Sequence, residues 1–261
     1  MAQAAALCHE AGADLIWKWP RITRQEFLDK ACRIPVQGIS GGVMGENISA
    51  LAAARRAFPD LPPLRGGSGL NIFNSQAARI FGRDCVSVTL SPPELSFDAI
   101  GTLVFRLTAG VETDPIPECI IHGPAELAVS EDCIIATAHG RCLQCGGDTP
   151  GDRPWFGIQD VKKHIFPVTV DAECRTHVWN SRETCIIDHL DLLVNAGIRH
   201  VAIDCRIRNG RYAESVVRAY QDAFALLIAG GESMKGGRKI QALKDRVHQR
   251  ASGGGLPPVT S

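Results

Sequence analysis

The chain has 261 residues, of which 45% are hydrophobic and 21% are charged, a composition typical of a globular protein. Lys and Arg number 28, as do Asp and Glu, so the formal net charge is zero and nucleic-acid binding by a uniformly basic chain is excluded. The chain has neither an apolar run long enough to span a bilayer nor the basic start of a secretory signal. We therefore expect a cytoplasmic protein without a membrane span.

Short apolar runs alternate with helical patterns through the first half of the chain. Asn47 and Asn74 stand directly before helical patterns at residues 48–58 and 75–82, where each is expected to act as an N-cap. The predicted strands cover residues 14–19, 35–39, 69–73, 86–90, 102–107 and 118–121. This alternation favours βαβ units and a parallel sheet.

After residue 160 the pattern changes and then returns. Residues 163–170 and 176–179 have the character of strands in a small antiparallel insertion. A helix at 187–195, a strand at 200–204 and an amphipathic helix at 214–229 restore the α/β alternation. From residue 230 the chain is Gly-rich and basic, which predicts a solvated helix and a flexible end, with RNA contact as the alternative.

Cysteines are concentrated between residues 118 and 185, which hold six of the ten: Cys119, Cys133, Cys142, Cys145, Cys174 and Cys185. In a reducing cytoplasm a cluster of this kind indicates a metal site rather than a disulfide framework. The four thiolates of Cys133, Cys142, Cys145 and Cys174 could hold tetrahedral zinc or an iron–sulfur cluster, and their spacing favours neither.

Some of these cysteines also have interpretations other than metal ligands. Cys142 and Cys145 form a C-x-x-C pair that could be a redox pair, although the βα turn of a thioredoxin-like domain is missing. Cys119 lies in a strand pattern and is expected to be a buried apolar side chain. The same is expected of the scattered cysteines, which are Cys8, Cys32, Cys85 and Cys205.

Glu94 and His122 follow predicted strand ends, where the loops of a βα barrel build its active face. A carboxylate and an imidazole there could perform acid/base chemistry or bind a small acid. The alternative is that Glu94 caps a helix and His122 is a satisfied core histidine. Arg175 and Arg206 could bind a carboxylate or phosphate, or form local ion pairs.

The sequence lacks the common motifs of hydrolases. Neither the G-x-S-x-G motif of serine hydrolases nor the H-E-x-x-H motif of zinc proteases occurs. A cysteine protease would require a thiol paired with a histidine, for which His139 and Cys142 remain open.

Four segments are similar to the collagenase-like peptidases of peptidase family U32. They are LNIFNSQAARIFG with the following VSVTLSPPEL (70–95), ECIIHGPAELAVSEDC (118–133), IFPVTVDAECRTHVWNS (165–181) and LLVNAGIRHVAIDCR (192–206). The resemblance implies an α/β fold: a partial TIM-type barrel with a small cysteine-bearing, β-rich insertion. It implies barrel units in 1–130, a cluster-binding region in 131–185, a closing αβα segment in 186–229 and a flexible tail in 230–261.

The resemblance also implies a function. It indicates a 4Fe–4S cluster on Cys133, Cys142, Cys145 and Cys174 in an enzyme of oxygen-independent hydroxylation. The substrate would be an RNA base or an aromatic ring, with prephenate as oxygen donor and Glu94, His122 and Arg175 near the substrate. A peptidase is the second expectation. Because the opening units of the family barrel are not matched, three alternatives stay open: a fragment, a barrel completed by a partner chain, or a reduced partial barrel. A non-catalytic subunit with structural zinc is the third functional alternative.

Overall fold

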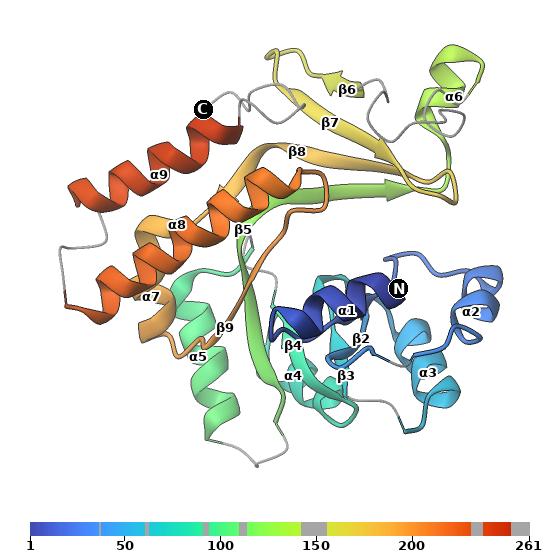
Figure 1. Cartoon of the computed structure of the whole chain (residues 1–261), viewed down its shortest axis with the longest axis horizontal. Helices are drawn as coiled ribbons and strands as arrows, with labels where there is room; N and C mark the ends of the chain where they lie inside the picture. Colours follow the sequence, from blue (N-terminus) through green and yellow to red (C-terminus); the bar gives the residue numbers. More distant parts are fainter. Residues whose placement is uncertain are drawn as a thin grey trace. The chain divides into compact units, whose positions relative to one another are not determined.

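The computed structural model describes residues 1–36, 38–60, 63–90, 94–109, 114–141, 156–230 and 237–251 (Figure 1). They form two compact units. The first comprises residues 1–120 and 192–202, and the second comprises residues 121–191 and the described residues from 203 onward.

A parallel sheet forms the centre of the first unit, in the order β1–β2–β3–β4 followed by the beginning of β5. Its elements are α1 (Ala2–Glu10), β1 (Ile16–Lys18), α2 (Gln25–Ala31), β2 (Gly42–Gly45), α3 (Ile48–Ala57), β3 (Leu64–Gly66), η1 (Ser68–Leu70), α4 (Ser75–Gly82), β4 (Cys85–Thr89) and α5 (Phe97–Thr108). The long β5 (Ile116–Ser130) pairs in parallel with β4 through Ser87 and Ile116.

The predicted N-caps of the first unit are confirmed. Asn47 Oδ1 accepts the backbone N–H of Ala50 at 2.8 Å, and Asn74 Oδ1 accepts that of Ala77 at the same distance. These bonds satisfy N–H groups that the first turn of each helix leaves unpaired.

Three strand predictions in the first unit were wrong. The strand expected at 35–39 lies at β2 and that expected at 69–73 lies at β3, with a 3₁₀ turn at 68–70. The strand β2 contains glycines, which sequence patterns do not associate with strands. Glycine is needed at position 45 because a Cβ there would lie 2.7 Å from Leu51 Cδ2. Residues 102–107 belong to helix α5, whose buried side chains recur at helical spacing: Ile100, Leu103, Val104 and Leu107.

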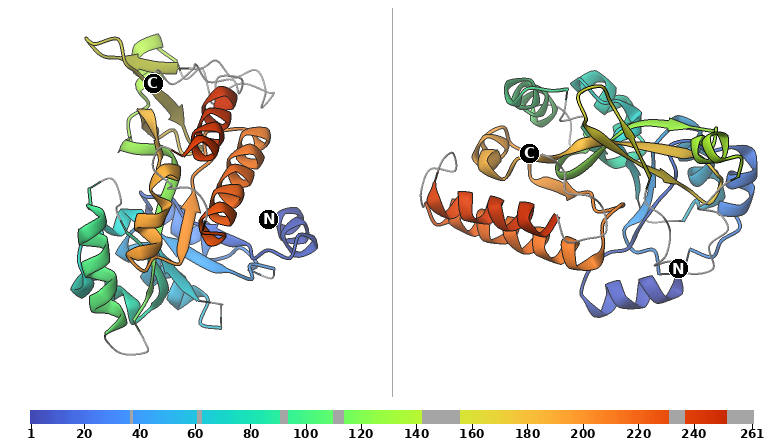
Figure 2. Two further views of the ribbon diagram at one scale, coloured as in Figure 1. Left: turned by 90° about the vertical axis from the view of Figure 1, so that its left-hand side faces the viewer. Right: turned by 90° about the horizontal axis from the view of Figure 1, so that it is seen from above.

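The second unit contains an antiparallel ladder, β5–β8–β7–β6, together with long helices (Figures 1 and 2). Its remaining elements are α6 (Ile134–His139), β6 (Phe156–Gln159), β7 (Ile165–Val170), β8 (Thr176–Cys185), η2 (Ile187–His189), α8 (Gly210–Ile228) and α9 (Arg238–Ala251). Helix α7 (Leu190–Asn195) and β9 (His200–Ile203), which pairs with β5, complete the order. Helices α8 and α9 lie side by side in both figures.

The α/β class is confirmed, and parallel strands alternating with helices are compatible with a partial barrel. Closure as a TIM-type barrel, the insertion and a completing partner chain stay predictions. No described helix has both the length and the apolar character needed to cross a bilayer.

Candidate functional site: a cysteine-bearing end of the β5–β8 ladder

Cys133 follows the end of β5 at Ser130 by three residues and directly precedes helix α6. It is the N-cap residue, and its Sγ accepts the backbone N–H of Ala136 at 3.4 Å. The side chain is half-buried and free of any disulfide. The thiol is therefore fixed by the start of a helix rather than carried on a loose loop.

Cys174 lies in the turn that joins β7 to β8, and its side chain is exposed. Its backbone has φ of 61°, in the left-handed region that costs a non-glycine residue about 1–3 kcal/mol. Asp171 organises this turn: its carbonyl oxygen accepts the Cys174 N–H at 3.1 Å, and its own N–H donates to Arg175 O at 3.0 Å.

The carboxylate of Asp171 adds further bonds within the same turn. Oδ1 accepts the backbone N–H groups of Glu173 and Arg175 at 3.0 and 2.9 Å, and Oδ2 accepts Arg175 Nε at 2.7 Å. His177 Nε2 lies 3.2 Å from the same Oδ2. Burial alone would raise the pKa of Asp171, but the bonds from Arg175 and His177 hold it below its usual value.

Thr176 joins the two cysteine-bearing segments. Ser130 at the end of β5 pairs with Thr176 at the start of β8. Thr176 Oγ1 donates to Asp132 O at 2.6 Å and accepts the Ile134 N–H at 3.0 Å, and the residue is only 2% exposed. Cys133, between Asp132 and Ile134, and Cys174, two residues before Thr176, are therefore held at the same end of one ladder.

This arrangement fits half of the predicted ligand set. Two residues with thiol side chains, the donors that iron–sulfur clusters and zinc prefer, lie in segments at the same end of the β5–β8 ladder. Cys142 and Cys145 lie outside the described residues. Within the described residues no group of three or more His, Cys, Asp and Glu is arranged to hold a metal ion, so the four-thiolate site stays a prediction.

The other cysteines differ in their surroundings. Cys119 is 0% exposed, as expected of a core residue, and burial raises the pKa of its thiol to about 12. Burial likewise raises the pKa of Cys85 to about 11. Cys8, Cys32 and Cys205, also expected in the core, are only half-buried.

His122 lies on β5 and is fully buried. Its Nε2 lies 2.8 Å from the hydroxyl of Tyr212, and its Nδ1 lies 3.3 Å from that of Tyr220. Tyr212 donates its own hydroxyl proton to Glu183 Oε2 at 2.6 Å, so His122 Nε2 is the donor in the first contact. The imidazole is thus enclosed by two tyrosines of α8.

The other two predicted catalytic residues occupy different surroundings. Glu94 is exposed and follows residues outside the described part of the chain. Arg175 is 5% exposed, and its guanidinium pairs with Asp171 and Glu173 at 2.7 Å each. Arg175 therefore supports the turn that carries Cys174.

A row of polar side chains on one face of β8 was not anticipated from the sequence. Alternate residues of a strand share a face, and on β8 these are His177, Trp179, Ser181, Glu183 and Cys185. Arg206 and Arg208, also two residues apart, face this row. Arg206 Cζ lies 4.7 Å from the Trp179 ring centroid, and Arg208 Nη2 lies 2.7 Å from Glu183 Oε1.

The Glu183–Arg208 pair is deeply buried, with side-chain exposures of 5% and 3%. Arg208 Nε also donates to Glu183 Oε1, at 2.8 Å. The signal in the sequence was the alternation in H-x-W-x-S-x-E, but nothing local identified its distant partners.

His177 forms a second charged group on the same face. Its Nδ1 lies 2.6 Å from Glu126 Oε1, on β5, and its Nε2 faces Asp171. The hydrogen bond with Glu126, supported by Asp171, raises the pKa of His177 despite its partial burial.

The first unit has its own buried carboxylate, Glu46, directly after β2. Its Oε1 lies 2.7 Å from Lys18 Nζ, and its Oε2 accepts the Gly69 N–H at 2.5 Å. Glu46 is 3% exposed. Its carboxylate therefore links Lys18, at the end of β1, to the backbone of the turn at Gly69.

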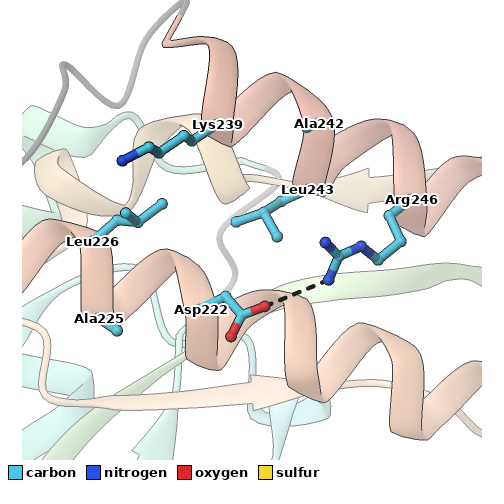
Figure 3. A pocket seen from close by; sticks show the side chains of 7 residues that line it. All are labelled: Asp222, Ala225, Leu226, Lys239, Ala242, Leu243 and Arg246. Carbon is cyan, nitrogen blue, oxygen red and sulfur yellow. Dashed lines mark hydrogen bonds and ion pairs between the residues drawn. The ribbon is translucent and has the colours of Figure 1, made fainter.

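A hollow of about 490 Å³ lies between helices α8 and α9 (Figure 3). It is lined by Asp222, Ala225, Leu226, Lys239, Ala242, Leu243 and Arg246. Its apolar lining comes from Ala225, Leu226, Ala242 and Leu243, and Asp222 pairs with Arg246 at 3.4 Å. None of the predicted site residues lines it.

Comparison of the sequence with known proteins identifies its family. The family model described as peptidase family U32 matches residues 1–255, so the chain belongs to peptidase family U32. It is 25% identical over 194 residues to tRNA hydroxylation protein P2 of Bacillus subtilis (strain 168), covering 73% of this chain and 60% of that protein. It is also 25% identical over 160 residues to a collagenase of Porphyromonas gingivalis (strain ATCC BAA-308 / W83), covering 59% of this chain and 37% of that protein.

The chain thus spans 60% of the length of one relative and 37% of the other. No solved structure matches it significantly.

Proposed function

We propose that this chain is an iron–sulfur protein of its family that serves oxygen-independent hydroxylation. The substrate is an RNA base or an aromatic ring, with prephenate as the oxygen donor. The observation that carries the proposal is the placement of Cys133 and Cys174 at one end of the β5–β8 ladder, joined through Thr176. The relative described as a tRNA hydroxylation protein supports the reaction class.

In this proposal Cys133, Cys142, Cys145 and Cys174 hold a 4Fe–4S cluster. A bound cluster supplies a one-electron redox centre or a Lewis acid. The chain's own contribution is to hold two thiols in place through the helix start at Ala136 and the turn around Asp171.

Arg206 lies over Trp179 and is 39% exposed. Its guanidinium is bound by Asp204, with Nη2 2.7 Å from Oδ2, and its Nη1 lies 3.7 Å from Glu126 Oε1. A carboxylate or phosphate bound at this fork would take the place of these carboxylates.

The test is iron and acid-labile sulfide content after strictly anaerobic purification, together with the absorption spectrum. We expect about four irons and four sulfides per chain, lost in Cys133→Ala and in Cys174→Ala. One zinc without iron would favour a non-catalytic partner subunit, and protein without any metal would contradict the proposal.

A peptidase is the second candidate, because one relative is a collagenase. It requires hydrolysis of a labelled collagen or gelatin substrate that a single substitution abolishes. Among the described residues, the fully enclosed His122 offers no open nucleophile–base pair for such a reaction.

A further inference from the structure

We infer that Asp171 is a positioning residue that presets Cys174 as a metal ligand, and this inference rests on the proposed function. Asp171 binds no metal in this assignment. It acts through the shape of the turn that it shares with Cys174 and Arg175.

The first argument is the backbone of Cys174. A cysteine at φ of 61° is held in a conformation that an unsupported chain leaves readily. The carbonyl of Asp171 holds the Cys174 N–H at 3.1 Å, and the Asp171 carboxylate holds the N–H groups on either side of it, those of Glu173 and Arg175. Three consecutive backbone donors therefore depend on one residue.

The second argument is that Asp171 is itself fixed from the strand. Its Oδ2 accepts Arg175 Nε and faces His177 Nε2, and His177 is held in turn by Glu126 of β5 at 2.6 Å. Glu126 lies on β5, the strand that leads to Cys133. The same network of hydrogen bonds therefore connects the turn of Cys174 to the strand that precedes Cys133. Partners of this kind, behind a metal ligand, set the ligand's direction.

The experiment compares Asp171→Ala with Glu173→Ala. Glu173 lies in the same turn and pairs with Arg175 at 2.7 Å, but none of the described backbone bonds of the turn uses its carboxylate. Both variants and the wild type are loaded anaerobically with iron and sulfide. Iron retention is then measured against increasing chelator, along with the electron paramagnetic resonance spectrum and the reduction potential of the cluster.

We expect the chelator concentration that removes half of the iron to fall about 10–100-fold in D171A, the usual effect of removing a supporting residue behind a metal ligand. E173A should resemble the wild type. Asp171→Asn should retain more iron than D171A, since its amide oxygen can still accept the two backbone N–H groups. It should retain less than the wild type and shift the potential, because its amide NH2 cannot accept from Arg175 Nε or His177 Nε2 and its charge is gone.

The outcomes separate the two proposals. A wild type loaded with cluster and a D171A variant with the same retention, spectrum and potential would overturn this inference alone. A wild type that takes up neither iron nor sulfide would overturn the proposed function and this inference with it. Far-UV circular dichroism identifies a variant that loses iron by unfolding, and in that case D171N decides: unchanged retention and potential would overturn the inference.

Discussion

Thr176 donates its hydroxyl proton to the carbonyl oxygen of Asp132 across 2.6 Å, while its own Oγ1 accepts the N–H of Ile134 at 3.0 Å. One side chain on β8 thus holds the residues on both sides of Cys133. The contact joins positions 44 residues apart in the chain. It converts the antiparallel register of β5 and β8 into a fixed position for a thiol.

Thr176→Val should weaken this junction without changing the volume of the side chain. Loss of the hydroxyl leaves a buried acceptor and a buried donor unpaired, which costs about 1–3 kcal/mol of unfolding free energy. Thr108→Val is the control, because its hydroxyl only bonds Phe105 O at the exposed end of α5. Urea unfolding measures both variants, and equal effects would contradict the role assigned to Thr176.

Glu183→Gln should be among the most destabilising single changes in the second unit. It leaves the guanidinium of Arg208, 3% exposed, without its charged partner, at a cost of about 3–5 kcal/mol. Glu214→Gln is the matched control on α8, because Glu214 forms a solvent-exposed ion pair with Arg218 at 2.9 Å. The exposed pair should contribute no more than about 0.5 kcal/mol.

Double-mutant cycles with Arg208→Met and Arg218→Met separate the pair energies from the single effects. A coupling energy at Glu183–Arg208 no larger than that at Glu214–Arg218 would refute the distinction.

Local signals were read correctly from the sequence because they act locally. Asn47 and Asn74 each accept a backbone N–H from the residue three positions further on, so a short stretch of sequence contains both the donor and the acceptor. Helix α5 was missed because Val104 and Phe105 have strand propensity, while the burial of its helical face is decided by tertiary packing.

Only part of the candidate site could be predicted from the sequence. The cysteines stand out by their chemistry, whereas Asp171 and Glu183 are ordinary acidic residues until β7, β8 and the segment before α8 are assembled. Glu183 meets Arg208 across 25 positions, which no motif of fixed spacing describes. The placement of Cys133 and Cys174 at the same end of the ladder likewise depends on the strand register.

Stability should depend on pH through His177. The pKa of His177 is raised in the folded state, chiefly by Glu126, so its ion pairs stabilise the fold while His177 is protonated. This contribution is complete below the unfolded-state pKa, provided that Glu126 and Asp171 remain ionised, and is lost as pH rises through the raised pKa.

The measurement is urea unfolding of the wild type and His177→Gln over a series of pH values. The stability gap between them should shrink as pH rises, and a gap that stays constant or widens would contradict the assignment. His200→Gln, which removes an exposed histidine on β9, is the control variant.

Gly123→Ala tests why glycine follows His122. Gly123 has φ of 125°, and a Cβ there would collide with the carbonyl oxygen of Asp204, whose own N–H donates to His122 O at 2.8 Å. Gly140 also has positive φ, 70°, but a Cβ there meets nothing within 4 Å. Gly140→Ala should therefore cost only the backbone strain of about 1 kcal/mol, whereas Gly123→Ala should cost clearly more because backbone must move. Equal losses in thermal or urea unfolding would show that the close approach of residues 123 and 204 carries no energy of its own.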